Sequence, residues 1–163
     1  MKSLLIVYHS VTGGTEQMAH AAAKGAAAEA SLEVKLMRAA EAQARDLLQA
    51  DGYLFAAPEN LAAVAGLMKD FFDRTYYSVL EQINGRPYAV LICAGSDGQN
   101  AARQIERIAK GWRLKPVVPT LIVCTHAQTR EAILRPKMIV PEDLKRCEEI
   151  GATLAAGLAL GVF

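Results

Sequence analysis

Short apolar runs alternate with segments of helical periodicity along the whole chain, and this alternation is the feature that most limits its fold. Residues 4–8, 53–57 and 88–93 are continuously apolar, which is typical of strands that are buried on both faces. Strands and helices that alternate in this way indicate βαβ units, in which helices cover both faces of a parallel sheet. The sequence therefore predicts an α/β fold.

Two further runs have the character of edge strands. Residues 32–37 alternate between apolar and charged side chains, so one face of that strand is expected to meet water. Residues 117–123 contain Pro119, and proline is confined to the edges of sheets because it has no N–H to donate. With these two strands at the edges, the chain predicts a doubly wound five-stranded parallel sheet of order 2-1-3-4-5.

Four segments have the periodicity of helices. The first opens at Thr15, and its polar stripe contains His20, which is expected to face solvent. The second and third cover residues 67–76 and 101–112, and Trp112 is expected to pack as an apolar contact where its helix ends. The last opens at Pro141, a residue favoured in the first turn of helices.

Length and composition limit the domain number, the location and the kinds of ligand that the chain can have. A chain of 163 residues fits one domain over residues 1–163, and its net charge of +1, with both signs scattered, gives no support for nucleic-acid binding. No segment resembles a secretory leader or is long enough to cross a membrane, so we expect a cytoplasmic protein. Cys93, Cys124 and Cys147 share no metal-binding spacing, which favours buried thiols in a reducing compartment and predicts no metal site.

The turn after the first predicted strand has the composition of an anion site. Its residues are rich in hydroxyl groups and glycine: Ser10, Val11, Thr12, Gly13, Gly14 and Thr15. The start of the following helix offers unpaired N–H groups and the positive end of the helix dipole to a phosphate. The turn fits neither the P-loop pattern nor the GxGxxG pattern of dinucleotide-binding proteins. A plain capping turn, with Thr15 as the helix cap, is the alternative.

At these residues the chain resembles the flavodoxin-like flavoproteins, whose phosphate loop reads [ST]-x-T-G-x-T. Residues 10–15 match every fixed position of that pattern. The resemblance extends over nearly the whole chain and implies a flavodoxin-like fold with flavin mononucleotide (FMN) as the cofactor.

The segment after the third strand resembles a second flavin loop, P-x-[aromatic]-x-G, which leads into the helix pattern K-x-F-x-D-R. The helix half matches at Lys69, Phe71, Asp73 and Arg74. The loop half departs from the family, because Asn60 stands where an aromatic residue is usual and Ala62 where glycine is usual. The backbone of the loop is still expected to bind the edge of the flavin ring through Pro58, Glu59, Asn60, Leu61 and Ala62.

A third loop follows the fourth strand. The resemblance implies that it meets the pyrimidine end of the flavin through Ala94, Gly95, Ser96, Asp97 and Gly98. A plain turn, with Asn100 capping the next helix, explains the same composition.

Residues 125–140 form a long connection that carries several basic side chains and His126. Connections of this length are often functional. It is interpreted either as a lid or subunit contact beside the flavin, with an arginine for a nicotinamide phosphate, or as a solvated surface loop. No catalytic role is assigned to His126.

The resemblance implies an oxidoreductase similar to the NAD(P)H-dependent FMN and quinone reductases, with NAD(P)H and a quinone or other small acceptor as partners. Because the flavin would carry the redox chemistry, no side chain is predicted to be catalytic. Two alternatives remain: a flavodoxin-type electron carrier and a non-redox anion-binding protein. Homo-oligomer formation is implied by the family resemblance alone.

Overall fold

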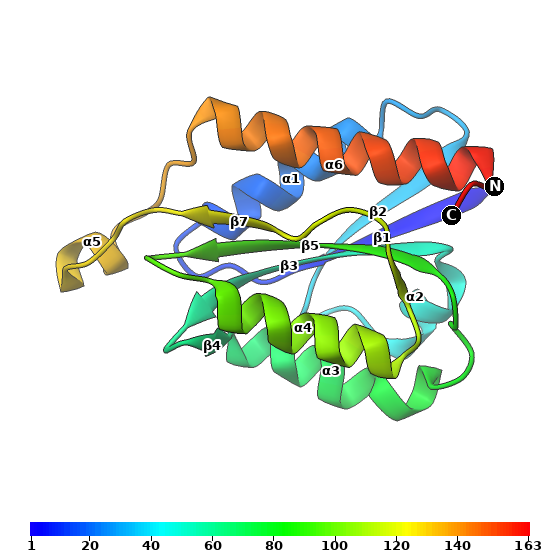
Figure 1. Cartoon of the computed structure of the whole chain (residues 1–163), viewed down its shortest axis with the longest axis horizontal. Coiled ribbons are helices and arrows are strands. Elements are labelled where there is room, and N and C mark those ends of the chain that lie inside the picture. The colour runs from blue at the N-terminus through cyan, green and yellow to red at the C-terminus, as the bar shows by residue number, and fades with distance from the viewer.

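The computed structural model describes residues 1–163 as a twisted parallel sheet between two layers of helices (Figure 1). The long strands are β1 (Lys2–Tyr8), β2 (Leu32–Arg38), β3 (Gly52–Asn60) and β5 (Pro87–Ala94). Two short strands, β6 (Lys115–Pro116) and β7 (Leu121–Cys124), both pair with β5. The sheet order β2-β1-β3-β5-β6 confirms the predicted order 2-1-3-4-5, with β6 and β7 as two parts of the fifth strand.

The prediction of a continuous fifth strand over residues 117–123 is wrong. The structure has β6 before this range and β7 at its end, and no strand is formed between Val117 and Thr120. Val117 N–H donates to the Tyr88 carbonyl of β5 at 3.2 Å, just before the interruption. Pro119 has no N–H with which to continue this hydrogen bonding to β5. The same proline that indicated an edge strand therefore interrupts it.

The helices cover the two faces of the sheet as expected. One face carries α1 (Gly14–Ala26) and α6 (Pro141–Leu160), and the other carries α2 (Ala44–Gln49), α3 (Gly66–Val79) and α4 (Gln99–Gly111) (Figure 1). Each face packs its own apolar cluster, of 20 and 25 buried residues respectively. His20 is exposed as predicted, and Trp112 is fully buried at the end of α4, where its indole N–H donates to the Tyr76 carbonyl.

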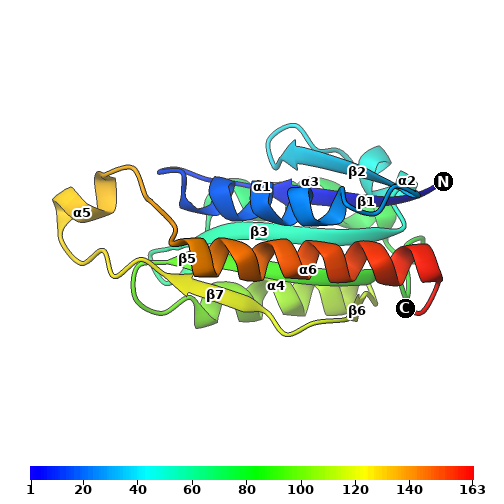
Figure 2. The same cartoon turned by 90° about the horizontal axis from the view of Figure 1, so that it is seen from above.

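Two short elements lie at the carboxyl ends of the strands. Strand β4 (Ala63–Val64) pairs antiparallel with the end of β3, and helix α5 (Arg130–Leu134) projects beyond the sheet between β7 and α6 (Figures 1 and 2). Neither element was predicted. No helix of the chain combines the length and the apolar character that crossing a membrane requires.

Candidate functional site

The three predicted loops meet at the carboxyl ends of the strands, where they line one cleft of about 580 Å³. Of the sixteen residues predicted for the site, all but Gly13, Asp97 and Gly98 line this cleft. This position agrees with the rule that ligands of open α/β sheets bind outside the carboxyl ends of the strands, where the strand order reverses.

The first wall of the cleft is the turn between β1 and α1. Gly13 adopts a left-handed conformation (φ 92°), which glycine tolerates without strain, and its N–H donates to Ser10 Oγ at 3.1 Å. A Cβ at Gly14 would lie 2.8 Å from Cys93 Sγ, so any other residue there would displace the Cys93 side chain. Since the first turn of a helix leaves its N–H groups without intrahelical partners, those of Gly14, Thr15 and Glu16 are available to an anion.

The capping alternative for Thr15 is wrong. Gly13 is the N-cap residue of α1 and no side chain caps the helix, so Thr15 lies inside the first turn. Thr15 is 1% exposed, and its Oγ1 makes no hydrogen bond of good geometry within the chain, although it lies near the Cys93 thiol and lowers the pKa of that group. A buried hydroxyl without a partner costs folding free energy, on the order of 1–3 kcal/mol. An external acceptor or donor at the turn would remove that cost.

Cys93 lies beneath this turn and was not predicted as part of the site. Burial raises the pKa of its thiol to about 11, while the nearby Lys137 ammonium and Thr15 hydroxyl act in the opposite direction. The thiol is therefore neutral at physiological pH and contributes to packing under Gly14.

Charged groups on the outer side of the turn are paired with one another. Glu16 Oε1 accepts from Arg38 at 2.6 Å and from the Tyr8 hydroxyl at 3.0 Å. The His9 pKa is lowered, first by burial and then by Arg38. An anion in the turn would thus be held mainly by N–H and hydroxyl donors.

The second wall is a β-hairpin, because β3 extends to Asn60 and turns back through β4. Pro58, Glu59 and Asn60 therefore lie in a strand, where an irregular loop was expected. The Glu59 carboxylate accepts hydrogen bonds from Gly98 N–H at 2.9 Å and from Ala101 N–H at 3.1 Å. Glu59 thus caps α4, and its carboxylate is occupied within the chain.

The third loop is fixed by this cap. Gly98 is the N-cap residue of α4, with φ 85°, so the capping role considered for Asn100 is wrong. Asn100 lies in the first turn and donates instead to the Ala62 carbonyl of the hairpin. The second and third loops are consequently held together by the side chains of Glu59 in the hairpin and Asn100 in α4.

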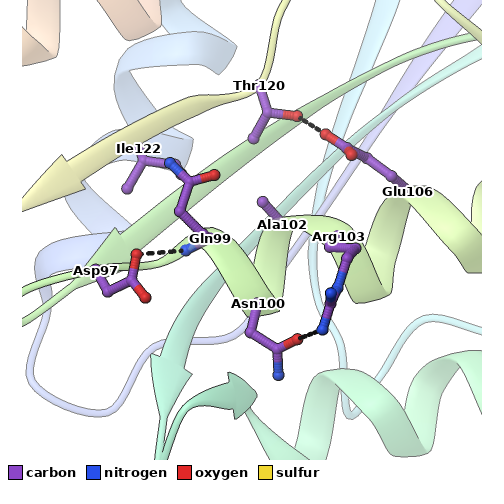
Figure 3. Close-up of a pocket in the computed structure, with 8 residues that line it drawn as sticks. All are labelled: Asp97, Gln99, Asn100, Ala102, Arg103, Glu106, Thr120 and Ile122. Carbon is purple, nitrogen blue, oxygen red and sulfur yellow. Dashed lines mark hydrogen bonds between the residues drawn. The ribbon is translucent and has the colours of Figure 1, made fainter.

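Asp97 faces a different depression, on the outer side of α4 (Figure 3). The polar side chains there are paired with one another: Thr120 donates to Glu106 at 2.6 Å, and Arg103 donates to Asn100 at 2.6 Å. The depression has no unpaired buried group, and we assign no site to it.

The connection over residues 125–140 forms a fourth wall. At one end, Thr125 N–H donates to the Ala94 carbonyl of the third loop. At the other end, Lys137 N–H donates at 2.8 Å to the Thr12 carbonyl of the phosphate turn (residues 10–15). Gln17 holds this end, since its amide bonds both the Lys137 carbonyl and Ile139 N–H. The connection adds to the cleft the residues Thr125, Ala127, Gln128, Ile133, Leu134 and Lys137.

These six residues were not predicted individually. The length of the connection and its start at the carboxyl end of the last strand were the available signals. The connection lines the cleft and most of its residues are exposed, so the interpretations as a lid and as a solvated surface loop both stay open. His126, although adjacent, does not line the cleft.

Comparisons with known proteins agree with this geometry. A family model described as NADPH-dependent FMN reductase matches residues 37–129, more than half of the chain. A flavodoxin of Aquifex aeolicus is 34% identical over 60% of this chain and 53% of its own length. An NAD(P)H dehydrogenase (quinone) of Acidithiobacillus ferrooxidans is 33% identical over 46% of this chain and 48% of its own length. The chain spans about half the length of these curated relatives.

Solved structures share the whole fold. A flavodoxin from the domain Archaea superposes with a TM-score of 0.80 at 19% identity and covers 96% of this chain and 99% of its own. Flavodoxin 1 from Bacillus cereus superposes with a TM-score of 0.77 at 23% identity over the same shares. At these identities the likeness establishes the flavodoxin-like fold.

Proposed function

Because the chain belongs to the NADPH-dependent FMN reductase family, we propose that it is an FMN-binding oxidoreductase that takes reducing equivalents from NAD(P)H and passes them to a flavin or quinone acceptor. The observation that carries the proposal is the Thr15 hydroxyl, which is buried in the phosphate turn without a partner. A phosphate is the ligand whose oxygens suit this hydroxyl and the N–H groups of the first turn.

The chain's own residues divide the binding of FMN among the walls of the cleft. The turn over residues 10–15 would hold the phosphate, the hairpin at residues 58–62 would face the ring, and the backbone of Ala94, Gly95 and Ser96 would meet its pyrimidine end. The chemistry that FMN supplies when bound is hydride acceptance followed by electron transfer to an acceptor. The protein would orient the ring and exclude water, with no side chain acting as acid or base.

The basic side chains of the fourth wall suit a nicotinamide dinucleotide phosphate. Arg130 and Arg135 are exposed, and Lys137 lines the cleft beside the phosphate turn. We place the nicotinamide nucleotide at this side of the cleft, with a quinone or other small acceptor entering by the same opening.

An electron carrier without its own substrate is the second candidate, since one relative is a flavodoxin. The net charge of +1 argues against it, because a carrier that docks on charged partners benefits from a strong field of one sign. We propose a cytoplasmic location, which the three free cysteines support. Homo-oligomer formation is also proposed, and light scattering of the purified protein tests it.

The proposal is tested by the visible spectrum of the purified protein before and after incubation with FMN and desalting. Flavin retained near one per chain, followed by NAD(P)H oxidation that depends on added quinone, would support the reductase. Flavin that is bound but not reduced by either nucleotide would favour the carrier. A protein that takes up no FMN would contradict both.

A further inference from the structure

The wall formed by residues 125–140 is joined to the rest of the chain at few points. Helix α5 buries none of its residues and projects beyond the sheet (Figure 2). At the start of the connection, the N–H groups of Thr125 and His126 donate to carbonyls of the third loop. From residue 127 to residue 138, the only hydrogen bonds that reach other parts of the chain are those of the Lys137 N–H and carbonyl groups. The position of α5 therefore depends on how Lys137 is held.

A single side chain of α1 holds this end of the connection. The amide N–H of Gln17 donates to the Lys137 carbonyl at 2.7 Å, and its amide oxygen accepts from Ile139 N–H at 3.1 Å. A neighbouring strand in a parallel sheet pairs in the same way, with one carbonyl and with the N–H two residues further on. The second amide N–H of Gln17 donates to the Gly13 carbonyl at 2.9 Å. Gln17 thus ties the connection directly to the phosphate turn.

The Lys137 side chain extends this contact to α5. Its ammonium donates to the carbonyls of Ile133 and Arg135, at 2.8 and 2.6 Å, where α5 ends. The hydrogen bonds from the phosphate turn to α5 therefore run through Gln17 and Lys137, with no apolar packing of α5 to support them. A segment that is held by so few bonds opens at little cost in free energy, so the loss of one contact should displace it in many molecules.

We propose that Gln17 is a positioning residue of the reductase, which keeps the wall over residues 125–140 where it receives the nicotinamide nucleotide. The inference rests on the proposed function, which places that nucleotide beside this wall. Gln17 does not itself line the cleft, so it acts through Lys137 and α5 and not by touching a ligand. When the wall is free to move, only the molecules with the wall in place bind the nucleotide, and the apparent affinity falls by that fraction.

Two substitutions of Gln17 test this role. Gln17→Met keeps the length and helix propensity of the side chain but removes all three hydrogen bonds. Gln17→Glu keeps an oxygen for Ile139 N–H and removes the donors. Gln82→Met is the matched control, because the Gln82 amide also donates to a carbonyl, that of Ser78, and does not line the cleft.

The kinetic test uses FMN-loaded protein with a quinone as the acceptor. The KM for NAD(P)H should rise about five- to tenfold in both Gln17 variants, because the loss of hydrogen bonds lowers the fraction of molecules with the wall in place. The kcat should stay within about twofold, since saturating nucleotide selects those molecules. The control should keep the wild-type KM and kcat.

Two measurements without turnover accompany the kinetics. Trypsin should cleave FMN-free Gln17 variants after Arg130 about five- to tenfold faster than wild type. The Kd for FMN, from titration of its fluorescence, should rise no more than about threefold, because the other three walls of the cleft stay in place.

A wild-type KM in either Gln17 variant would overturn the inference and leave the proposed function intact. A Kd for FMN that rises as far as the KM would also overturn it, since Gln17 would then shape the phosphate turn itself. Wild-type protein that binds FMN but oxidises neither NADH nor NADPH would overturn the proposed function, and the inference with it.

Discussion

At the scale of single residues, the two most buried threonines of the chain differ in one respect. Thr15 and Thr75 are each 1% exposed and lie in helices, but Thr75 Oγ1 donates to the Phe71 carbonyl at 2.7 Å whereas Thr15 Oγ1 has no partner. The unpaired hydroxyl therefore lowers the stability of the chain at the phosphate turn, whereas the paired hydroxyl in α3 does not. A ligand-binding role explains that difference.

Replacement of Thr15 by valine should separate ligand binding from stability. Thr15→Val removes the unpaired hydroxyl at nearly constant volume, so the free energy of unfolding of FMN-free protein should stay constant or rise by about 1 kcal/mol. The Kd for FMN should rise at least about tenfold, since a hydrogen bond to a charged group is lost. Thr75→Val is the matched control and should leave the Kd unchanged. Urea unfolding and FMN fluorescence measure both, and an unchanged Kd in Thr15→Val would contradict the assignment.

The buried thiols predict a loss of stability in alkali. Burial raises the pKa of Cys93 to about 11 and that of Cys147 to about 12, above the ordinary value of 9.0. Because these folded-state values are raised, the unfolded chain loses its thiol protons first, and stability falls as the pH rises from about 9 towards 11. For Cys93 the loss by pH 11 is on the order of 2 kcal/mol.

This loss is measured by urea unfolding at pH 8.5 and 10.5. The free energy of unfolding should fall between pH 8.5 and 10.5 by roughly 1–2 kcal/mol less in Cys93→Ala than in wild type. The cavity left by the substitution lowers stability equally at the two pH values and does not affect this difference. Equal decreases in the two proteins would show that the thiol ionises as readily in the folded state as in the unfolded chain.

At the scale of elements, the hairpin and α4 behave as one unit joined by Glu59. Glu59→Ala removes both acceptors at the start of α4 and should lower the free energy of unfolding by about 1–2 kcal/mol. Glu59→Gln keeps one acceptor and should lose less. Glu142→Ala, which removes an exposed carboxylate from the first turn of α6, is the control and should cost about 0.5 kcal/mol or less. Urea unfolding gives all three values, and equal losses in the Glu59 and Glu142 variants would contradict the cap.

The same unit shows why some features could be predicted from sequence and others could not. Strands and the phosphate turn are encoded by neighbouring residues: apolar runs form the sheet, and hydroxyls with glycine start α1. The role of Glu59 depends on N–H groups 39 and 42 positions away, and no local pattern reports that distance. Helix α5 and strand β4 are five and two residues long, too short for periodicity to appear.

At the scale of the whole molecule, the cleft joins segments from most of the chain, from Ser10 to Lys137. Three of its walls are anchored in the sheet and its helices. The fourth is different, because α5 buries none of its residues and is fixed only through the ends of its connection. The wall of the cleft formed by residues 125–140 is therefore also the wall with the least support from the core.

Limited proteolysis should reveal this difference. In FMN-free protein, trypsin should cut first after Arg130, because local opening of α5, which has no buried side chains, costs little free energy. FMN that fills the cleft would contact Ile133 and Leu134 and stabilise the closed segment, so cleavage should slow by up to the factor 1 + [FMN]/Kd. Mass spectrometry of the early fragments identifies the site. Thr15→Val at the same FMN concentration should be protected less, since it binds FMN at the other side of the cleft more weakly. A first cut elsewhere, or a rate that FMN does not change, would mean that the fourth wall takes no part in binding.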